Sequence, residues 1–280
     1  METLRITRNE SGVVDVRMAR PEVFNAFDER MIEELARVFA ELGRDETVRV
    51  VVLSGEGKAF SAGADLQWMQ RASQASVEWN LEDARRFAAM LDAIASCPKP
   101  TIARVHGVAL GGGVGLACAC DMAVASGDAR FAASEARFGI LPAVISPYLV
   151  NAVGKRHALR LALTASRIDA QTALQIGMVQ QVVDAADLDA AVEAIVAELL
   201  ANGPRALAEI KALFGQLEVG PVTPGVRELT ARTISRVRGT DEAREGFAAF
   251  LAKRPAAWIR ATPGARTGQS VNNTTRSTTQ

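Results

Sequence analysis

Two short glycine-rich segments have residue types that could hold a negatively charged oxygen. They are 61–65 (SAGAD) and 110–113 (LGGG), and each follows an apolar, largely β-branched run that indicates a buried strand. Small side chains let a ligand approach backbone N–H groups, and the N-terminus of a following helix would add a positive dipole end. Both segments are therefore candidate anion or oxyanion sites, although tight turns between packed strands and helices use the same residues.

Neither segment carries a nucleotide-binding motif. The pattern GxGxxG cannot be completed from Gly111, because residue 116 is Leu, or from Gly113, because residue 118 is Cys. No Gly-Lys-Ser/Thr sequence follows either segment, which argues against a P-loop.

Glu135 could be only a surface carboxylate, but its neighbours favour a partly buried carboxyl group. It lies between a short predicted strand and the apolar sequence FGILP, and such surroundings raise the pKa of a carboxyl group. His106 and His157 are better explained as structural residues, since one precedes a glycine turn and the other lies among basic residues on a helix. Ser61 with His106 could mimic a hydrolytic triad, but no nucleophile elbow surrounds the serine.

The elements that must position these residues alternate between strands and helices, which predicts an α/β fold. Apolar positions with a 3.6-residue period predict a helix from Asp28 that stops at Gly43, and later helices at 77–95 and 111–118. Strands are expected at 48–53, 102–105, 122–125 and 130–133, and short helices at 146–153, 157–164 and 170–176. After 178–183 only helical periodicity continues, at 187–201, 204–214, 224–238 and 241–252.

This change of pattern near residue 200 divides the chain. We expect a core in 1–200, a helical region in 201–261 and a tail in 262–280, where Thr, Ser, Gly and Asn leave almost nothing to bury. The 280 residues hold 32 basic and 32 acidic side chains, which makes nucleic acid an improbable partner. No apolar run is long enough to span a membrane and the start lacks a signal peptide, so we expect a cytoplasmic protein.

Four motifs, AFSAGADL, HGVALGGG, ACDMAVAS and FAASEARFGILP, follow one another along the chain. In order and spacing they resemble the enoyl-CoA hydratase/isomerase, or crotonase, family, and the resemblance extends from residue 10 to about 256. It implies a spiral of ββα units with a helical C-terminal region that forms trimers, often paired into hexamers. It also implies an acyl-CoA substrate and no cofactor apart from the CoA that the substrate carries; three scattered cysteines give no reason to expect a metal.

The resemblance assigns roles to individual residues. The backbone N–H groups of Ala64 and Gly112 match the family's oxyanion hole, which holds the thioester oxygen as charge develops on it. Ala62 matches a position whose backbone contacts the CoA adenine, and Asp65 ends the same CoA-binding loop, where it would cap or brace the chain. Lys253 matches a basic residue that reaches CoA phosphates from a neighbouring subunit, although an exposed lysine on a terminal helix needs no such role.

The catalytic carboxylates depart from the family pattern. Hydratases of the family carry two glutamates; the second matches Glu135, but the first falls on Gly115. A hydratase that works with Glu135 alone, an isomerase with one proton shuttle, and a CoA-binding scaffold without turnover all remain compatible with this loss. The combination of GGGVGL with SEARFGILPAVISPYL, in which Ala143 replaces a common glycine, resembles a branch that hydrates branched glutaconyl-CoA esters in leucine or terpene breakdown. We therefore favour the hydratase, and expect Gly115 to belong to a remodelled pocket in which the acyl group takes the space of the missing side chain.

Overall fold

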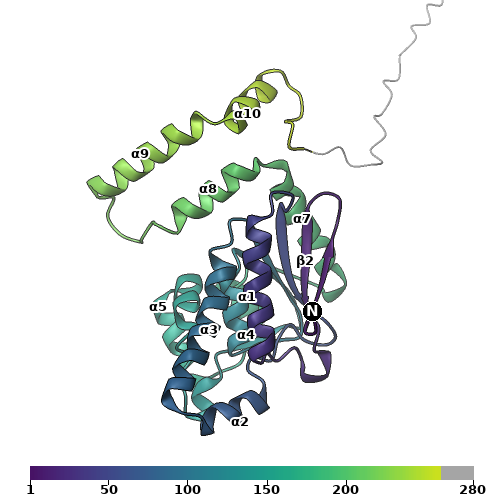
Figure 1. Ribbon diagram of the computed structural model, residues 1–280, viewed down its shortest axis with the longest axis vertical. Helices are drawn as coiled ribbons and strands as arrows, with labels where there is room; N and C mark the ends of the chain where they lie inside the picture. The colour runs from purple at the N-terminus through teal and green to yellow at the C-terminus, as the bar shows by residue number, and fades with distance from the viewer. Residues whose placement is uncertain (260–280) are drawn as a thin grey trace, which may run out of the picture.

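A computed structural model describes residues 1–259 and contains a six-stranded central sheet with helices packed around it (Figure 1). The strand order in the six-stranded sheet is β1-β2-β3-β4-β6-β9, and every pair is parallel except the first. These strands are β1 (Leu4–Arg8), β2 (Val13–Met18), β3 (Val50–Gly55), β4 (Thr101–Val105), β6 (Met122–Ser126) and β9 (Gln181–Val183). A smaller sheet, in the order β5-β7-β8, contains β5 (Val108–Leu110), β7 (Arg130–Ala132) and β8 (Ile168–Asp169).

Helices cover both faces of the central sheet, which explains why β3 is buried along its whole length. On one face, α1 (Glu29–Arg44), α3 (Val77–Ala95), α4 (Gly112–Ala119) and α5 (Ser146–Thr164) enclose the larger core, to which Val51 and Leu53 belong. On the other face, Val50 and Val52 pack against α7 (Leu188–Ala201). Alternate residues of one strand thus serve two cores, as expected for a parallel sheet.

Some predicted helix boundaries are wrong, because they depend on contacts between residues that are distant in the sequence. Helix α1 runs through Gly43 to Arg44, because the absence of a side chain at Gly43 lets Pro98 pack closely there. By contrast, the break predicted between helices 146–153 and 157–164 is present, because the backbone of α5 is kinked and non-helical at Gly154, where φ is 74°. The sequence analysis missed α2 (Leu66–Gln74), a short helix capped by Asp65.

The C-terminal helices follow the predicted ranges and stand apart from the sheet. They are α8 (Pro204–Phe214), α9 (Pro224–Arg238) and α10 (Asp241–Leu251), and α10 lies at the opposite end of the molecule from α2 (Figure 1). No helix within 1–259 combines the length and apolarity needed to cross a membrane. The mixed α/β class is confirmed, whereas the predicted tail, 262–280, lies outside the described residues.

Candidate active site

The two glycine-rich segments interlock where the two sheets meet. Ser61 forms a parallel bridge with Ala109, and the N–H of Leu110 donates to the Ser61 carbonyl at 3.0 Å. Gly63 has φ of 86°, and a side chain there would overlap the Leu110 carbonyl. A side chain at Gly113 would overlap the carbonyl of Ser61 in the same way. The glycines are therefore needed for the close approach of the two segments.

This approach leaves two backbone N–H groups available. Phe27 donates its N–H to Gly63 O at 2.8 Å and accepts from the Asp65 N–H at 3.0 Å, so the Ala64 N–H between them has no acceptor within 1–259. Gly112 is the first residue of α4, and its N–H is likewise without an acceptor in that range. Both residues line one cavity, which brings the two predicted oxyanion donors together.

The cavity has a volume of about 790 Å³ and mostly apolar walls. One wall comes from α2 and α3, and the other from the segment after β7 together with residues 140–145. Phe27 lies 5.2 Å from Phe87 and 6.0 Å from Trp68, measured between ring centroids. Any side chain at Gly112 would overlap the Phe27 ring. A thioester placed here would therefore have its carbonyl among free N–H groups and its acyl chain among apolar side chains.

Glu135 lies beside the glycine segment, at the start of a short 3-10 helix, η2 (Glu135–Phe138). Its Oε1 is 3.2 Å from the position that a Cβ at Gly111 would take, and its buried Oε2 has no hydrogen-bond partner within 1–259. Burial raises the pKa of this carboxyl. A cavity-facing carboxylate with a free oxygen and weakened acidity can accept a proton from water.

The space beside Gly115 differs from the expectation. A Cβ at this position would overlap the Ile145 side chain, whose Cβ is 2.9 Å away, and would lie 3.6 Å from Leu91 Cδ1. Ile145 is buried and also lines the cavity. The volume of the missing glutamate is thus filled by the protein's own isoleucine and is not open for an acyl group.

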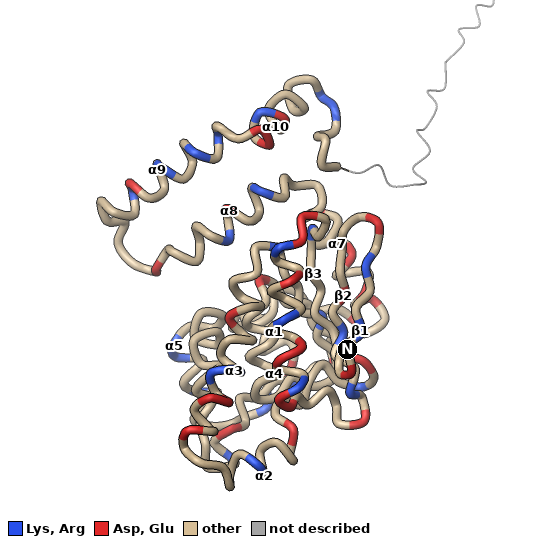
Figure 2. Tube along the Cα trace, viewed as in Figure 1, with Lys and Arg blue, Asp and Glu red and all other residues tan. Residues whose placement is uncertain are grey.

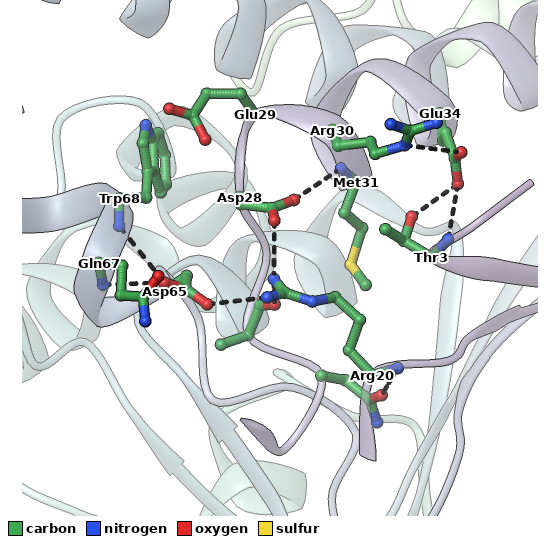
Figure 3. Close-up of polar contacts among 12 residues, drawn as sticks. Thr3, Arg20, Asp28, Glu29, Arg30, Met31, Glu34, Asp65, Gln67 and Trp68 are labelled. Atoms are coloured by element: carbon green, nitrogen blue, oxygen red, sulfur yellow. Dashed lines mark hydrogen bonds and ion pairs between the residues drawn. The ribbon is translucent and has the colours of Figure 1, made fainter. Parts of the chain in front are cut away.

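Asp65 braces the loop through three partners. It accepts hydrogen bonds from the N–H groups of Gln67 and Trp68, and its Oδ2 lies 3.0 Å from Arg20 Nη2 (Figure 3). Arg20 also pairs with Asp28 at the start of α1. Burial opposes ionisation of Asp65, but these donors outweigh it and lower its pKa. The side chain is thereby occupied in holding α2 to α1, and Asp65 is not part of the cavity lining.

The remaining predicted site residues fall in different places. Ala62 lines the cavity, whereas Lys253 follows α10 and is exposed outside it, so only a second subunit could bring a lysine from this position to the site. Ser61 donates its hydroxyl to the Asn25 carbonyl, and His106 contacts Arg104 and the Gly57 carbonyl. The hydrolytic triad is therefore not formed.

Asp83, which was not predicted from the sequence as a site residue, also lines the cavity. It lies on α3, only 6% exposed, and its Oδ2 accepts from Trp68 Nε1 at 3.1 Å. The sequence held one signal for it: Asp83 precedes Phe87 by one helical turn, so an acidic side chain shares a face with an apolar one.

Residues 8–261 match the family described as Enoyl-CoA hydratase/isomerase. The chain belongs to this family. The crystal structure of an enoyl-CoA hydratase from Shewanella pealeana is 41% identical, with a TM-score of 0.88 over 91% of this chain and 96% of its own. Pseudomonas aeruginosa AtuE is 37% identical, with a TM-score of 0.88 over 92% of this chain and 100% of its own. The 1,2-epoxyphenylacetyl-CoA isomerase of Escherichia coli is 31% identical over 88% of this chain and 94% of its own.

Membership confirms the crotonase fold and hydratase/isomerase chemistry as the general activity, and an acyl-CoA substrate is consistent with it. The relatives include hydratases and isomerases, so membership alone does not choose between these two reactions. The choice depends on the residues of this cavity.

Proposed function

We propose that this member of the family is a hydratase that adds water across the double bond of a branched, carboxylated 2-enoyl-CoA thioester. The observation that carries the proposal is Glu135: a half-buried residue whose buried Oε2 is unpaired, in the same cavity as the free N–H groups of Ala64 and Gly112. This combination supplies a base for water and donors for the negative charge that appears on the thioester oxygen.

In the proposed reaction, the Glu135 carboxylate takes a proton from water while the water oxygen bonds to the β-carbon. The displaced electron pair moves through the α-carbon to the thioester oxygen, where the Ala64 and Gly112 N–H groups stabilise it. Preorganised donors of this kind contribute about 3–4 kcal/mol each in other enzymes. Protonation of the α-carbon then completes the addition. CoA enters as part of the substrate, with Ala62 at the adenine and Lys253 of a neighbouring subunit at the phosphates.

The carboxylated acyl group is supported by two cationic residues of the cavity. Arg137 and Arg167 both line it, and neither guanidinium has an ion-pair or hydrogen-bond partner within residues 1–259. A guanidinium group binds a carboxylate through two parallel hydrogen bonds, which makes this wall suitable for an acidic acyl chain.

An isomerase is the second candidate, and Gly115 is the observation that favours it. Moving a double bond requires one group that takes a proton from one carbon and returns it to another, so a single carboxylate suffices. One assay separates the possibilities: loss of conjugated-enoyl absorbance indicates hydration, its appearance from a non-conjugated ester indicates isomerisation, and no change with retained CoA-ester binding indicates a scaffold.

The same assay tests the substrate. We expect a higher kcat/KM for a branched enoyl-CoA with a terminal carboxylate than for an uncharged ester of equal length. Arg137→Gln and Arg167→Gln should remove that preference while changing the uncharged substrate little. An equal loss on both substrates would instead place the arginines at the CoA phosphates and contradict a carboxylate subsite.

We also propose that residues 201–261 form the contact between subunits of a cytoplasmic trimer or dimer of trimers. The support is the apolar surface of α9 and α10, which includes Ile234, Phe247, Phe250 and Leu251. A solitary appendage would not keep so many large apolar side chains in water.

A further inference from the structure

Two acidic side chains line the cavity within residues 1–259, and only Glu135 has a role so far. The other is Asp83. Burial raises the pKa of both carboxyl groups, and they are the only carboxyl groups in that part of the chain with a pKa shifted upward. All other carboxyl shifts resolved there are downward. Perturbed acids that converge on one cavity are typical of catalytic sites.

The two carboxyl groups belong to different walls of the cavity. Phe87 Cζ lies 3.1 Å from the position that a Cβ at Gly112 would take, and Asp83 precedes Phe87 by one turn of α3. In the same way, Glu135 Oε1 lies 3.2 Å from the position that a Cβ at Gly111 would take. The backbone at 111–112, where the thioester oxygen would bind, therefore lies between the η2 wall and the α3 wall.

We propose that Asp83 is the second acid–base group of this site and acts in place of the glutamate that Gly115 and Ile145 exclude. The inference depends on the hydratase activity proposed above. Protonated Asp83 gives its proton to the α-carbon as the electron pair returns from the thioester oxygen, and becomes a carboxylate. Glu135 has by then gained the proton of the attacking water. Exchange of one proton with solvent at each carboxyl restores both groups, so the net reaction adds one water.

The surroundings of Asp83 suit an acid that is held in place. Trp68 of α2 donates to Oδ2, and Arg86 of α3 lies 3.8 Å from Oδ1. The charge of Glu29 on α1 adds to burial in raising the pKa of Asp83, whereas the charges of Arg86 and of Arg71 on α2 lower it. The Trp68 hydrogen bond favours the carboxylate, so it lowers the pKa against the larger effect of burial.

The first experiment is the pH profile of kcat/KM for hydration by wild type and Asp83→Asn. Asparagine keeps the size of the side chain and still accepts the Trp68 N–H. Because Asp83 must be protonated to act, wild-type activity falls as the pH rises through its pKa. We expect Asp83→Asn to lose about 10²-fold in kcat/KM and to lack this high-pH limb. Glu82→Gln, on the exposed side of the same turn, is the matched control and should keep the limb.

The second experiment uses Trp68→Phe, which removes the hydrogen bond but leaves the carboxyl. Loss of a donor to the carboxylate raises the pKa of Asp83 further, so the high-pH limb should move to higher pH. A limb that moves downward or stays in place would contradict the assignment.

The outcomes separate this inference from the proposed function. If wild type hydrates no enoyl-CoA, the proposed function fails. If wild type is active and Asp83→Asn retains its kcat/KM, or loses activity while keeping the high-pH limb, the proposed function stands. Asp83 would then only hold the cavity wall through Trp68, and the inference would be wrong.

Discussion

Helices α4 and α9 show two opposite relations between a helix and its surroundings. In α4, seven of eight residues are buried, whereas α9 has no buried residue along its 15 positions. Charged side chains are frequent along α9 and absent from α4 (Figure 2). The first helix is determined by close contacts with the rest of the same chain. The second leaves all its side chains at least partly exposed in the single subunit.

We therefore expect substitutions around α4 to change activity, and substitutions in α9 and α10 to change the proposed assembly of subunits. Around α4, the Phe27 ring, the Ser61 carbonyl and the Ile145 side chain lie so close that Gly112, Gly113 and Gly115, respectively, have no room for a Cβ. Around α9 and α10, the described chain leaves open space, so most substitutions are tolerated by the monomer.

The largest effect is expected at the base beside α4. Glu135→Gln should keep CoA-ester binding and lower turnover by about 10² or more, because the amide cannot accept the proton of water. In wild type, activity should rise with pH through the raised pKa of Glu135, so its low-pH limb should lie above the ordinary range of a glutamate. Steady-state kinetics across pH checks both points. Near-normal turnover in the variant would remove Glu135 from the mechanism.

Gly115→Glu should be the next most damaging change. The new side chain would collide with Ile145, and overpacking of this kind costs about 1–3 kcal/mol, to which an unpaired buried carboxylate adds. We expect lower stability and a lower kcat/KM on branched substrates. Adding Ile145→Gly should recover part of the stability, and this double-mutant cycle tests whether the two positions share one volume. A gain by the single variant on both straight and branched esters would instead identify a lost catalytic acid.

Asp65→Ala should lower the free energy of unfolding moderately, because Asp65 braces the loop that leads into the cavity. Loss of the α2 cap costs about 1 kcal/mol, and loss of the Arg20–Asp65 ion pair adds to it. Asp169→Ala removes a cap without an ion pair, at α6 (Ala170–Gln175), and is the control with the smaller loss. Because the folded state lowers the pKa of Asp65, its contribution is present above the unfolded pKa and is lost as the pH falls through the folded one. Urea unfolding at neutral and acidic pH measures this; equal losses in both variants would exclude a role for Arg20.

The smallest effect on a single subunit is expected in α10. Phe250 is 81% exposed, so Phe250→Ser should change the free energy of unfolding of one subunit by no more than about 0.5 kcal/mol. It should nevertheless weaken assembly, which light scattering at micromolar concentration detects as a lower mass. A wild-type protein that is monomeric under these conditions would contradict the subunit contact.

Much of the fold could be predicted from local patterns. The helices α3, α8 and α9 occupy the predicted ranges, because each has a clear apolar period and a Ser, Pro or Gly at its boundary. Helix α2 was missed, since its nine residues give a weak pattern and its start depends on the Asp65 cap. The predicted stop at Gly43 failed because the glycine serves the packing of Pro98 and not the end of a helix.

The sequence by itself determined the α/β class and the two glycine segments, because these depend on residue type and short spacing, and its resemblance to the family singled out Glu135. Only the tertiary structure decided what fills the space beside Gly115 and which second acid faces the cavity. Ile145 and Asp83 lie 30 residues after and 32 residues before Gly115 along the chain. Both line the same cavity because of how α3, α4 and α5 pack together, and no local pattern carries that information.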